Sequence, residues 1–163
     1  MTTLYVYCDA SFKDKNGVCS FVDTHTKTFY VSNTYHGVSS INAELYAIHF
    51  SLMESIKIAR KYNYENIVVY SDLLMAENIN KGGSSRYPLM QYLSQIICMF
   101  SDEINIQIKF HGKEGLMRMV DTLAYRKIRS KNLVAEKKEV FGNYYSYPVL
   151  DYNVQMMNNL KAS

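Results

Sequence analysis

The alternation of apolar and polar residues predicts five strands. Residues 3–10, 18–23 and 28–32 are rich in aromatic and β-branched side chains. The polar stretch THTK between the last two predicts a hairpin. Residues 66–72, NIVVYSD, form a compact apolar run. Residues 104–110, INIQIKF, alternate regularly, which places four apolar side chains on one face: Ile104, Ile106, Ile108 and Phe110.

A second periodicity, of three and four residues, predicts helices between the later strands. Over residues 41–61 it produces an apolar stripe of Leu45, Ile48, Leu52, Ile56 and Ala59. We also expect a short helix at 73–80, ended by NKGGSSRYP, and helices at 89–100 and 117–129. The segment SNTYHGVSS is expected to be a loop. Three successive strands followed by β-α alternation predict a mixed α/β sheet flanked by helices.

Length and composition limit the classes of protein. A chain of 163 residues is long enough for one domain with a substantial core, predicted at residues 1–135. Residues 136–163, rich in Tyr and Asn, are expected to form a C-terminal tail. The net charge of +3 is small, so any anionic partner would bind to a local basic surface.

Cysteine usage and hydropathy point to an intracellular protein. The three cysteines are odd in number and form no CxxC pair, which argues against disulfides or a cysteine zinc site. No signal peptide begins the sequence, and no apolar run approaches the roughly 20 residues of a membrane span. We therefore expect a soluble, cytoplasmic protein with reduced thiols and no membrane association.

Four acids lie at the ends of predicted elements. Asp9 interrupts the first strand, Glu44 lies in the first turn of the long helix, Asp72 ends the strand NIVVYSD, and Asp121 lies early in the last helix. Each has a structural alternative: a buried polar partner for Asp9, the helix dipole for Glu44, an N-cap for Asp72 and a solvated charge for Asp121. In a mixed sheet packed by helices, however, these positions can converge on one edge.

Convergence of these acids would favour metal chemistry. Crowded carboxylates repel one another, and divalent cations relieve that repulsion. Mg²⁺ prefers oxygen ligands, and two ions about 4 Å apart can serve both oxygens of a phosphoryl transfer. An acidic cluster without Cys or His ligands therefore suggests metal-dependent phosphodiester chemistry.

The order of these motifs resembles type I ribonuclease H and its wider fold family. The matching stretches are YVYCDAS, NAELYAI, VVYSD and VDTLA, together with His111 ten residues before Asp121. The resemblance covers roughly residues 3–130 and implies a ribonuclease H-like fold with a five-stranded mixed sheet. The short INKGGSSRYP leaves no room for the basic helix of larger members, so this is the compact form.

The resemblance also implies an activity. Asp9, Glu44, Asp72 and Asp121 would bind two Mg²⁺ or Mn²⁺ ions, and the enzyme would hydrolyse the RNA strand of an RNA–DNA hybrid. In the family the glutamate also contacts a ribose 2′-hydroxyl. His111 would assist proton transfer or product release, its alternative being a surface histidine.

Nucleic-acid contacts are expected around the site. The family's hybrid-contacting asparagines correspond to Ser40 and Ile41, with Asn42 one position closer to the glutamate, and Met117 replaces another common asparagine. Six basic residues in or beside nearby loops are candidates for binding phosphates: Lys13, Lys15, Lys81, Arg86, Lys113 and Arg118. Their alternative is ordinary solvated charge.

Two other functions remain open on the same fold. One is a Holliday junction resolvase or another DNA nuclease, and the other is a non-catalytic domain that binds nucleic acid or protein. Fold alone does not decide among them.

Overall fold

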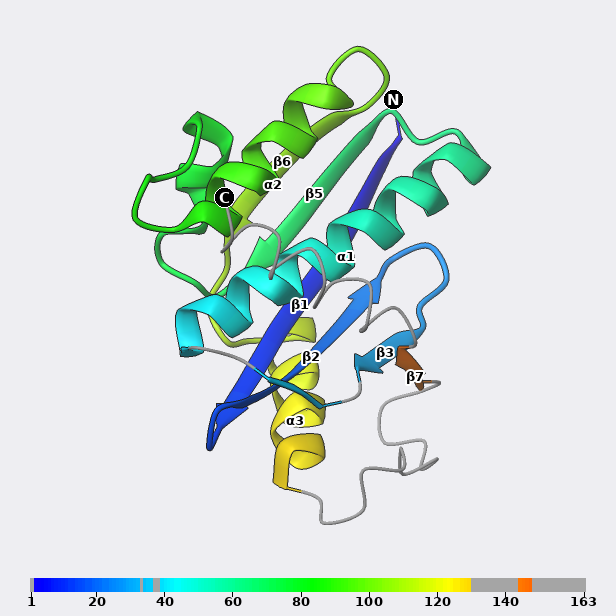
Figure 1. The fold of residues 1–163 in the computed structure, drawn as a ribbon. Helices are drawn as coiled ribbons and strands as arrows, with labels where there is room; N and C mark the ends of the chain where they lie inside the picture. Colours follow the sequence, from blue (N-terminus) through cyan, green and yellow to red (C-terminus); the bar gives the residue numbers. More distant parts are fainter. Residues whose placement is uncertain (1, 33, 37–38, 130–143, 148–163) are drawn as a thin grey trace.

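The computed structural model describes residues 2–32, 34–36, 39–129 and 144–147, which form one mixed sheet flanked by helices (Figure 1). The strands are β1 (Thr3–Lys13), β2 (Asn16–Asp23), β3 (Phe29–Ser32), β4 (Tyr35–His36), β5 (Asn66–Ser71), β6 (Asn105–Phe110) and β7 (Tyr144–Tyr147). The helices are α1 (Ser40–Tyr62), the 3₁₀ helix η1 (Ala76–Lys81), α2 (Pro88–Met99) and α3 (Leu116–Arg129).

The strand order is β6-β5-β1-β2-β3-β7, and β4 pairs with β2. The pairs β1–β2 and β2–β3 are antiparallel, whereas β5 is parallel to both β1 and β6. Asp14 and Lys15 adopt left-handed conformations, with φ of 51° and 64°, and so make the tight turn between β1 and β2. The five predicted strands are thus present, and the short strands β4 and β7 extend the sheet.

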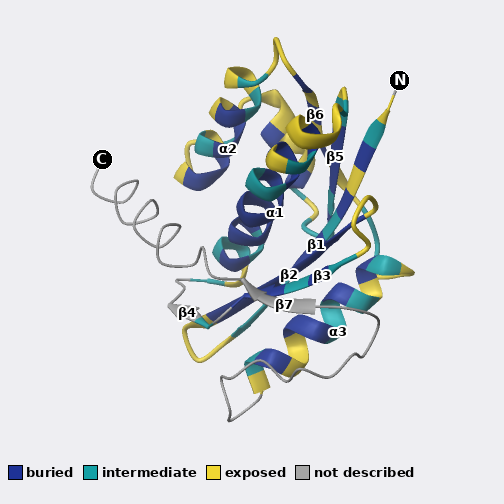
Figure 2. Cartoon of the chain, turned by 90° about the vertical axis from the view of Figure 1, so that its right-hand side faces the viewer, coloured by how far each residue is buried: buried dark blue, intermediate teal, exposed yellow. Residues whose placement is uncertain are grey.

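Helices cover both faces of the sheet, with α1 and α2 on one side and α3 on the other (Figure 2). The larger core lies under α1 and α2 and includes Val6, Ile48, Leu52, Ile67 and Leu93. The smaller core joins α3 to β2 and β3 and includes Val22, Val31, Val120 and Leu123. Alternation along β1 sends Val6 and Cys8 into the larger core, whereas Tyr7 packs against the smaller one.

Helix α1 begins and ends with recognisable caps. The side chain of Ser39 accepts a hydrogen bond from the backbone N–H of Asn42 at 3.1 Å. At the other end Asn63 takes a left-handed conformation, which stops the helix before β5. These caps fix where Glu44 lies along the helix.

Several predicted boundaries were wrong. The expected helix at 73–80 is a 3₁₀ helix that starts at Ala76, and the expected loop SNTYHGVSS contains the short strand β4. Phe110 does not join the buried isoleucines of β6, because its side chain is 40% exposed at the end of the strand. The predicted domain boundary near residue 135 lies outside the described residues, as does the predicted tail apart from β7.

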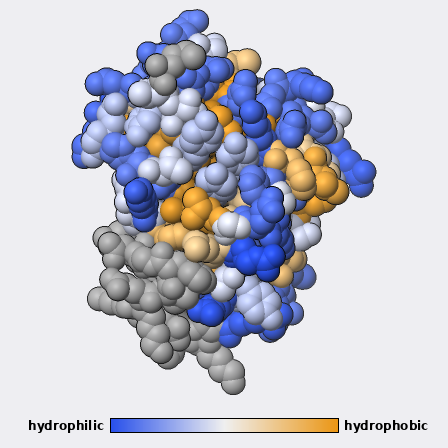
Figure 3. Space-filling view, turned by 180° about the vertical axis from the view of Figure 1, so that it is seen from behind, coloured by the Kyte–Doolittle hydropathy of each residue, from blue (hydrophilic) through white to orange (hydrophobic). Residues whose placement is uncertain are grey.

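A few large apolar side chains are exposed, such as Leu74, Met99 and Tyr125. The view from behind shows a largely hydrophilic face with small separate apolar patches (Figure 3). None of the helices in the described part of the chain has the length and hydrophobicity needed to cross a membrane.

Candidate active site

Asp9 lies just beyond the point on β1 where its pairing with β5 ends. On one side Asp9 pairs with Ser20 of β2, whereas the register with β5 ends at Tyr7 and Tyr70. Strand β5 ends at Ser71, and Asp72 follows at once. Because the two strands are parallel, continuing their register brings Asp72 alongside Asp9.

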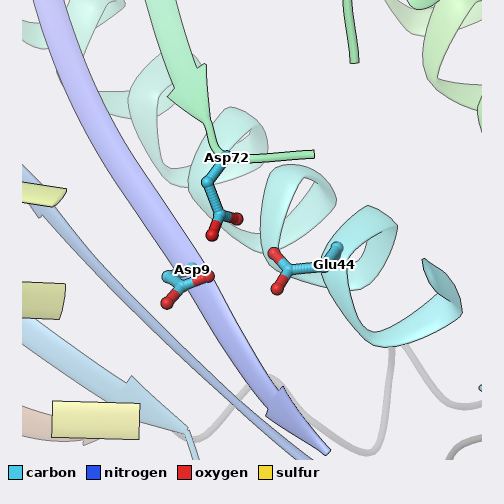
Figure 4. Close-up of side chains that lie close together, drawn as sticks. All are labelled: Asp9, Glu44 and Asp72. Carbon is cyan, nitrogen blue, oxygen red and sulfur yellow. The ribbon is translucent and has the colours of Figure 1, made fainter. Parts of the chain in front are cut away.

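Glu44 reaches the same place from α1. One carboxylate oxygen from each of Asp9, Glu44 and Asp72 lies within 4.8 Å of the others, and the three side chains point toward one another (Figure 4). The backbone N–H of Ala10 lowers the pKa of Glu44 and so partly opposes the effect of burial. Glu44 is not in the first turn of α1, as the sequence suggested, but one turn further along.

Asp121 approaches from α3, on the opposite face of the sheet. Its carboxylate lies within hydrogen-bonding reach of Asp9. The ammonium Nζ of Lys113 links it to Asp72, at 3.2 Å from Asp121 Oδ1 and 3.5 Å from Asp72 Oδ2. Asp9, Glu44 and Asp72 thus form the close group, and Asp121 adjoins it through Asp9 and Lys113. We call the four acids the carboxylate cluster: Asp9, Glu44, Asp72 and Asp121.

The structural alternatives for these acids do not describe their positions. Met75, not Asp72, stands at the N-cap of η1. Asp121 is only partly solvated, with a side chain 32% exposed and paired with Lys113. Asp9 is 1% exposed, and neither of its oxygens accepts a hydrogen bond from a donor in the described residues.

The electrostatics of the carboxylate cluster oppose its full ionisation. Burial is the main cause that raises the pKa of Asp9 to about 11, followed by the negative charge of Glu44 and the neighbouring carboxylate of Asp121. Burial, and then the charge of Asp72, raise the pKa of Glu44 to about 8. Without a cation the cluster therefore holds protons at neutral pH.

This donor set fits a hard divalent cation. The oxygens are supplied by carboxylates of β1, of α1 and of the residue after β5, and the buried Asp9 oxygens have no donor of their own among the described residues. Mg²⁺ and Mn²⁺ favour such oxygen ligands. A bound cation would offset the burial and the mutual repulsion that favour the protonated forms of Asp9 and Glu44.

His111 lies close to the carboxylate cluster but packs against aromatic rings. Its ring meets those of Tyr7 and Tyr70 edge to face, with centroids 5.7 Å and 5.2 Å apart. Its Nδ1 donates to the Gly112 carbonyl at 2.7 Å, and its backbone N–H donates to the Ser71 carbonyl. In the described part of the chain no hydrogen bond or ion pair joins His111 to the cluster.

The predicted nucleic-acid residues lie on several different elements, and one of them contacts the carboxylate cluster. Lys113 touches it, and Arg118 donates to the Lys113 carbonyl at 3.1 Å. Asn42 lies two residues before Glu44, and its side-chain oxygen is buried without a hydrogen bond to any described residue. The others are exposed at element ends: Lys13 and Lys15 at the β1–β2 turn, Ser40 at the start of α1, Lys81 at the end of η1 and Arg86 before α2.

Neither a family model nor a curated protein matches the sequence. Solved structures do match. The RNase H1 of the halophilic archaeon Halobacterium salinarum NRC-1 is 11% identical, with a TM-score of 0.56 over 77% of this chain and 97% of that one. LC11-RNase H1, isolated from compost and solved in complex with an RNA/DNA hybrid, is 15% identical, with a TM-score of 0.57 over 73% of this chain and 91% of that one.

A third match is the N-terminal RNase H domain of a Mycobacterium tuberculosis protein, 12% identical, with a TM-score of 0.54 over 81% of this chain and 100% of that domain. At these identities the likeness concerns the fold. The chain therefore has the ribonuclease H-like fold that its motifs predicted.

Proposed function

We propose that this chain is a divalent-metal-dependent endonuclease of the ribonuclease H type, which hydrolyses the RNA strand of RNA–DNA hybrids. The observation that carries the proposal is Asp9, buried without a hydrogen-bond donor among the described residues and facing Glu44 and Asp72. An acid in that position is stable as an anion only beside a cation. The matching fold, including that of an RNase H1 bound to an RNA/DNA hybrid, supports the choice of substrate.

In this proposal the carboxylate cluster holds two Mg²⁺ or Mn²⁺ ions. When bound, such ions supply positive charge to the attacking water and to the departing 3′ oxygen. Water adds to the phosphorus, the bond from phosphorus to the 3′ oxygen breaks, and the products carry a 5′-phosphate and a 3′-hydroxyl. Asp9 contributes a ligand fixed by the sheet, while Glu44 stands where it can also accept a hydrogen bond from a ribose 2′-hydroxyl.

Residues around the carboxylate cluster complete the proposal. His111 assists proton transfer or product release, and the Tyr7 and Tyr70 rings hold it beside the cluster. Exposed basic side chains bind phosphates of the hybrid, namely those of Lys13, Lys15, Lys81, Arg86 and Arg118. Ser40 and Asn42 contact the hybrid at the start of α1. The intracellular location and the domain boundary at residue 135 stay predictions.

A cleavage assay with Mg²⁺ or Mn²⁺ on four matched substrates tests the proposal: RNA–DNA hybrid, RNA duplex, DNA duplex and four-way junction. We expect cleavage of the RNA in the hybrid and its loss in Asp9→Asn and Asp72→Asn. Cleavage of the junction alone would identify a resolvase instead. Binding of hybrid without any cleavage would identify a non-catalytic domain.

A further inference from the structure

Lys113 is placed differently from the other basic residues around the carboxylate cluster. Its Nζ stands between Asp72, which follows β5, and Asp121, which belongs to α3 on the other face of the sheet. Among the described residues it supplies the only ion pairs that the cluster makes. One ammonium thus occupies the half of the site that these two acids share.

The backbone that carries Lys113 is fixed on both sides. Before it, His111 is anchored to β5 by the hydrogen bond to the Ser71 carbonyl and by its packing against Tyr70. The Lys113 carbonyl itself accepts a hydrogen bond from Arg118 of α3. The side chain, in contrast, is 55% exposed, so the ammonium can leave the cluster without a movement of the loop.

The ammonium and a metal ion would compete for the same oxygens. Asp72 and Asp121 offer the oxygens that Lys113 now uses. An ammonium and a metal ion bound to the same oxygens would be close together and would repel each other strongly. Asp9 and Glu44 make no ion pair with Lys113. An ion that binds among Asp9, Glu44 and one oxygen of Asp72 therefore meets less competition than an ion that needs Asp121.

We propose that Lys113 is an internal counter-ion of the Asp72–Asp121 half of the site, and that a second divalent cation binds there only by displacing it. The inference rests on the proposed two-metal function and deepens it, because it makes the two ions unequal. The first binds readily, whereas the affinity for the second is set by Lys113. Once displaced, the Lys113 side chain is free to pair with a phosphate of the substrate.

The test is calorimetric titration of the substrate-free protein with Mn²⁺, for the wild type, Lys113→Gln and Lys113→Arg. We expect Lys113→Gln to bind the second ion about tenfold more tightly, because the incoming ion no longer has to break the two ion pairs of Lys113. Affinity for the first ion should change less, and Lys113→Arg should behave like the wild type. The matched control is Lys109→Gln, an exposed lysine of β6 that loses the same charge and makes no ion pair with a described residue.

A second measurement keeps the inference testable if the first is ambiguous. In EDTA, Lys113→Gln should melt at a lower temperature than the wild type and Lys109→Gln, because the carboxylate cluster has lost its counter-ion, and saturating Mn²⁺ should remove the difference. Unchanged affinity for the second ion in Lys113→Gln, or equal effects of Lys113→Gln and Lys109→Gln, would overturn the inference.

These outcomes are independent of the proposed activity. If Lys113→Gln tightens the second ion but no hybrid is cleaved, the counter-ion role stands and the proposed function fails. If hybrid is cleaved and the titrations of the variants are identical, the proposed function stands and the counter-ion role fails.

Discussion

At the scale of single residues, Asp9 is the strongest indication of a cation site. The strand places its carboxylate away from the larger core, yet the side chain is 1% exposed and faces other acids. A charged group in such a position reduces the stability of the metal-free protein, and a neutral isostere would relieve that effect. Function and stability therefore place opposite demands on this position.

Asp9→Asn should abolish cleavage of the hybrid while raising stability in EDTA at pH 7.5. The unfolded aspartate is ionised at that pH, whereas the folded one keeps its proton, so removing the titration stabilises the protein by about 1–3 kcal/mol. Urea unfolding in EDTA measures this difference. The matched control is Asp14→Asn at the exposed β1–β2 turn, which should change neither property. Lower stability of Asp9→Asn in EDTA would contradict this account.

The raised pKa of Glu44 should make the stability of the metal-free protein depend on pH. An unfolded glutamate ionises at about pH 4.3, whereas burial keeps the folded Glu44 protonated up to a pH near its pKa of about 8. Between these values the folded state binds more protons, so the free energy of unfolding falls as pH rises. The contribution is complete below about pH 4 and is lost above about pH 8.

Urea unfolding in EDTA at several pH values between 5 and 8 measures this slope. Glu44→Gln should make it shallower and leave the part that Asp9 contributes, because the glutamine does not titrate whereas Asp9 still does. Mg²⁺ binds the ionised acids, so its stabilising effect should grow over the same pH range. A wild-type slope equal to that of Glu44→Gln would show that another group is responsible.

At the scale of elements, the edge strand β6 is protected by η1. The Asn80 amide donates to the Ile108 carbonyl at 2.7 Å and accepts from the Ile108 N–H at 2.9 Å. Glu77 accepts a hydrogen bond from the Phe110 N–H at 3.2 Å. Side chains of η1 therefore occupy backbone groups that an edge strand would otherwise leave unpaired.

Asn80→Ala should lower the free energy of unfolding by about 1 kcal/mol, since it removes two hydrogen bonds from an exposed edge. Chemical denaturation measures the change. Asn78→Ala is the matched control, because Asn78 is exposed on the same 3₁₀ helix and its side chain makes no hydrogen bond with a described residue. Equal losses in the two variants would mean that the effect belongs to the helix and not to the edge of β6.

The sequence predicted the acids of the site better than their surroundings. Alternation along β1 and the end of β5 determine where Asp9 and Asp72 point, and both can be inferred from local pattern. The link made by Lys113 could not be inferred, because the direction of a long side chain in a loop depends on how α3 meets the sheet. The packing of His111 on Tyr7 and Tyr70 likewise depends on the register between β1 and β5.

At the scale of the whole molecule, charge is distributed so that only local surfaces can attract nucleic acid. The net charge is +3, and an acidic cluster lies at the proposed catalytic centre. Binding of a hybrid therefore depends on a few exposed lysine and arginine side chains and on the metal ions. Because these side chains release counter-ions from the phosphate backbone of the hybrid, their effect can be measured from the salt dependence of affinity.

Lys13 and Lys15, at the tip of the β1–β2 hairpin, supply the last prediction. If each neutralises one phosphate, changing both to Gln should lower the magnitude of the slope of log K against log salt by about 2. Fluorescence anisotropy with a labelled hybrid, in Mg²⁺ and with the cleavage-deficient Asp72→Asn background, measures that slope. Lys57→Gln is the matched control, because Lys57 lies on α1, where it pairs with Glu54 at 3.5 Å. A slope unchanged by the hairpin variants would mean that the hybrid binds elsewhere. The next basic residues to substitute would be Lys81 and Arg86, which flank the Gly82–Gly83 turn.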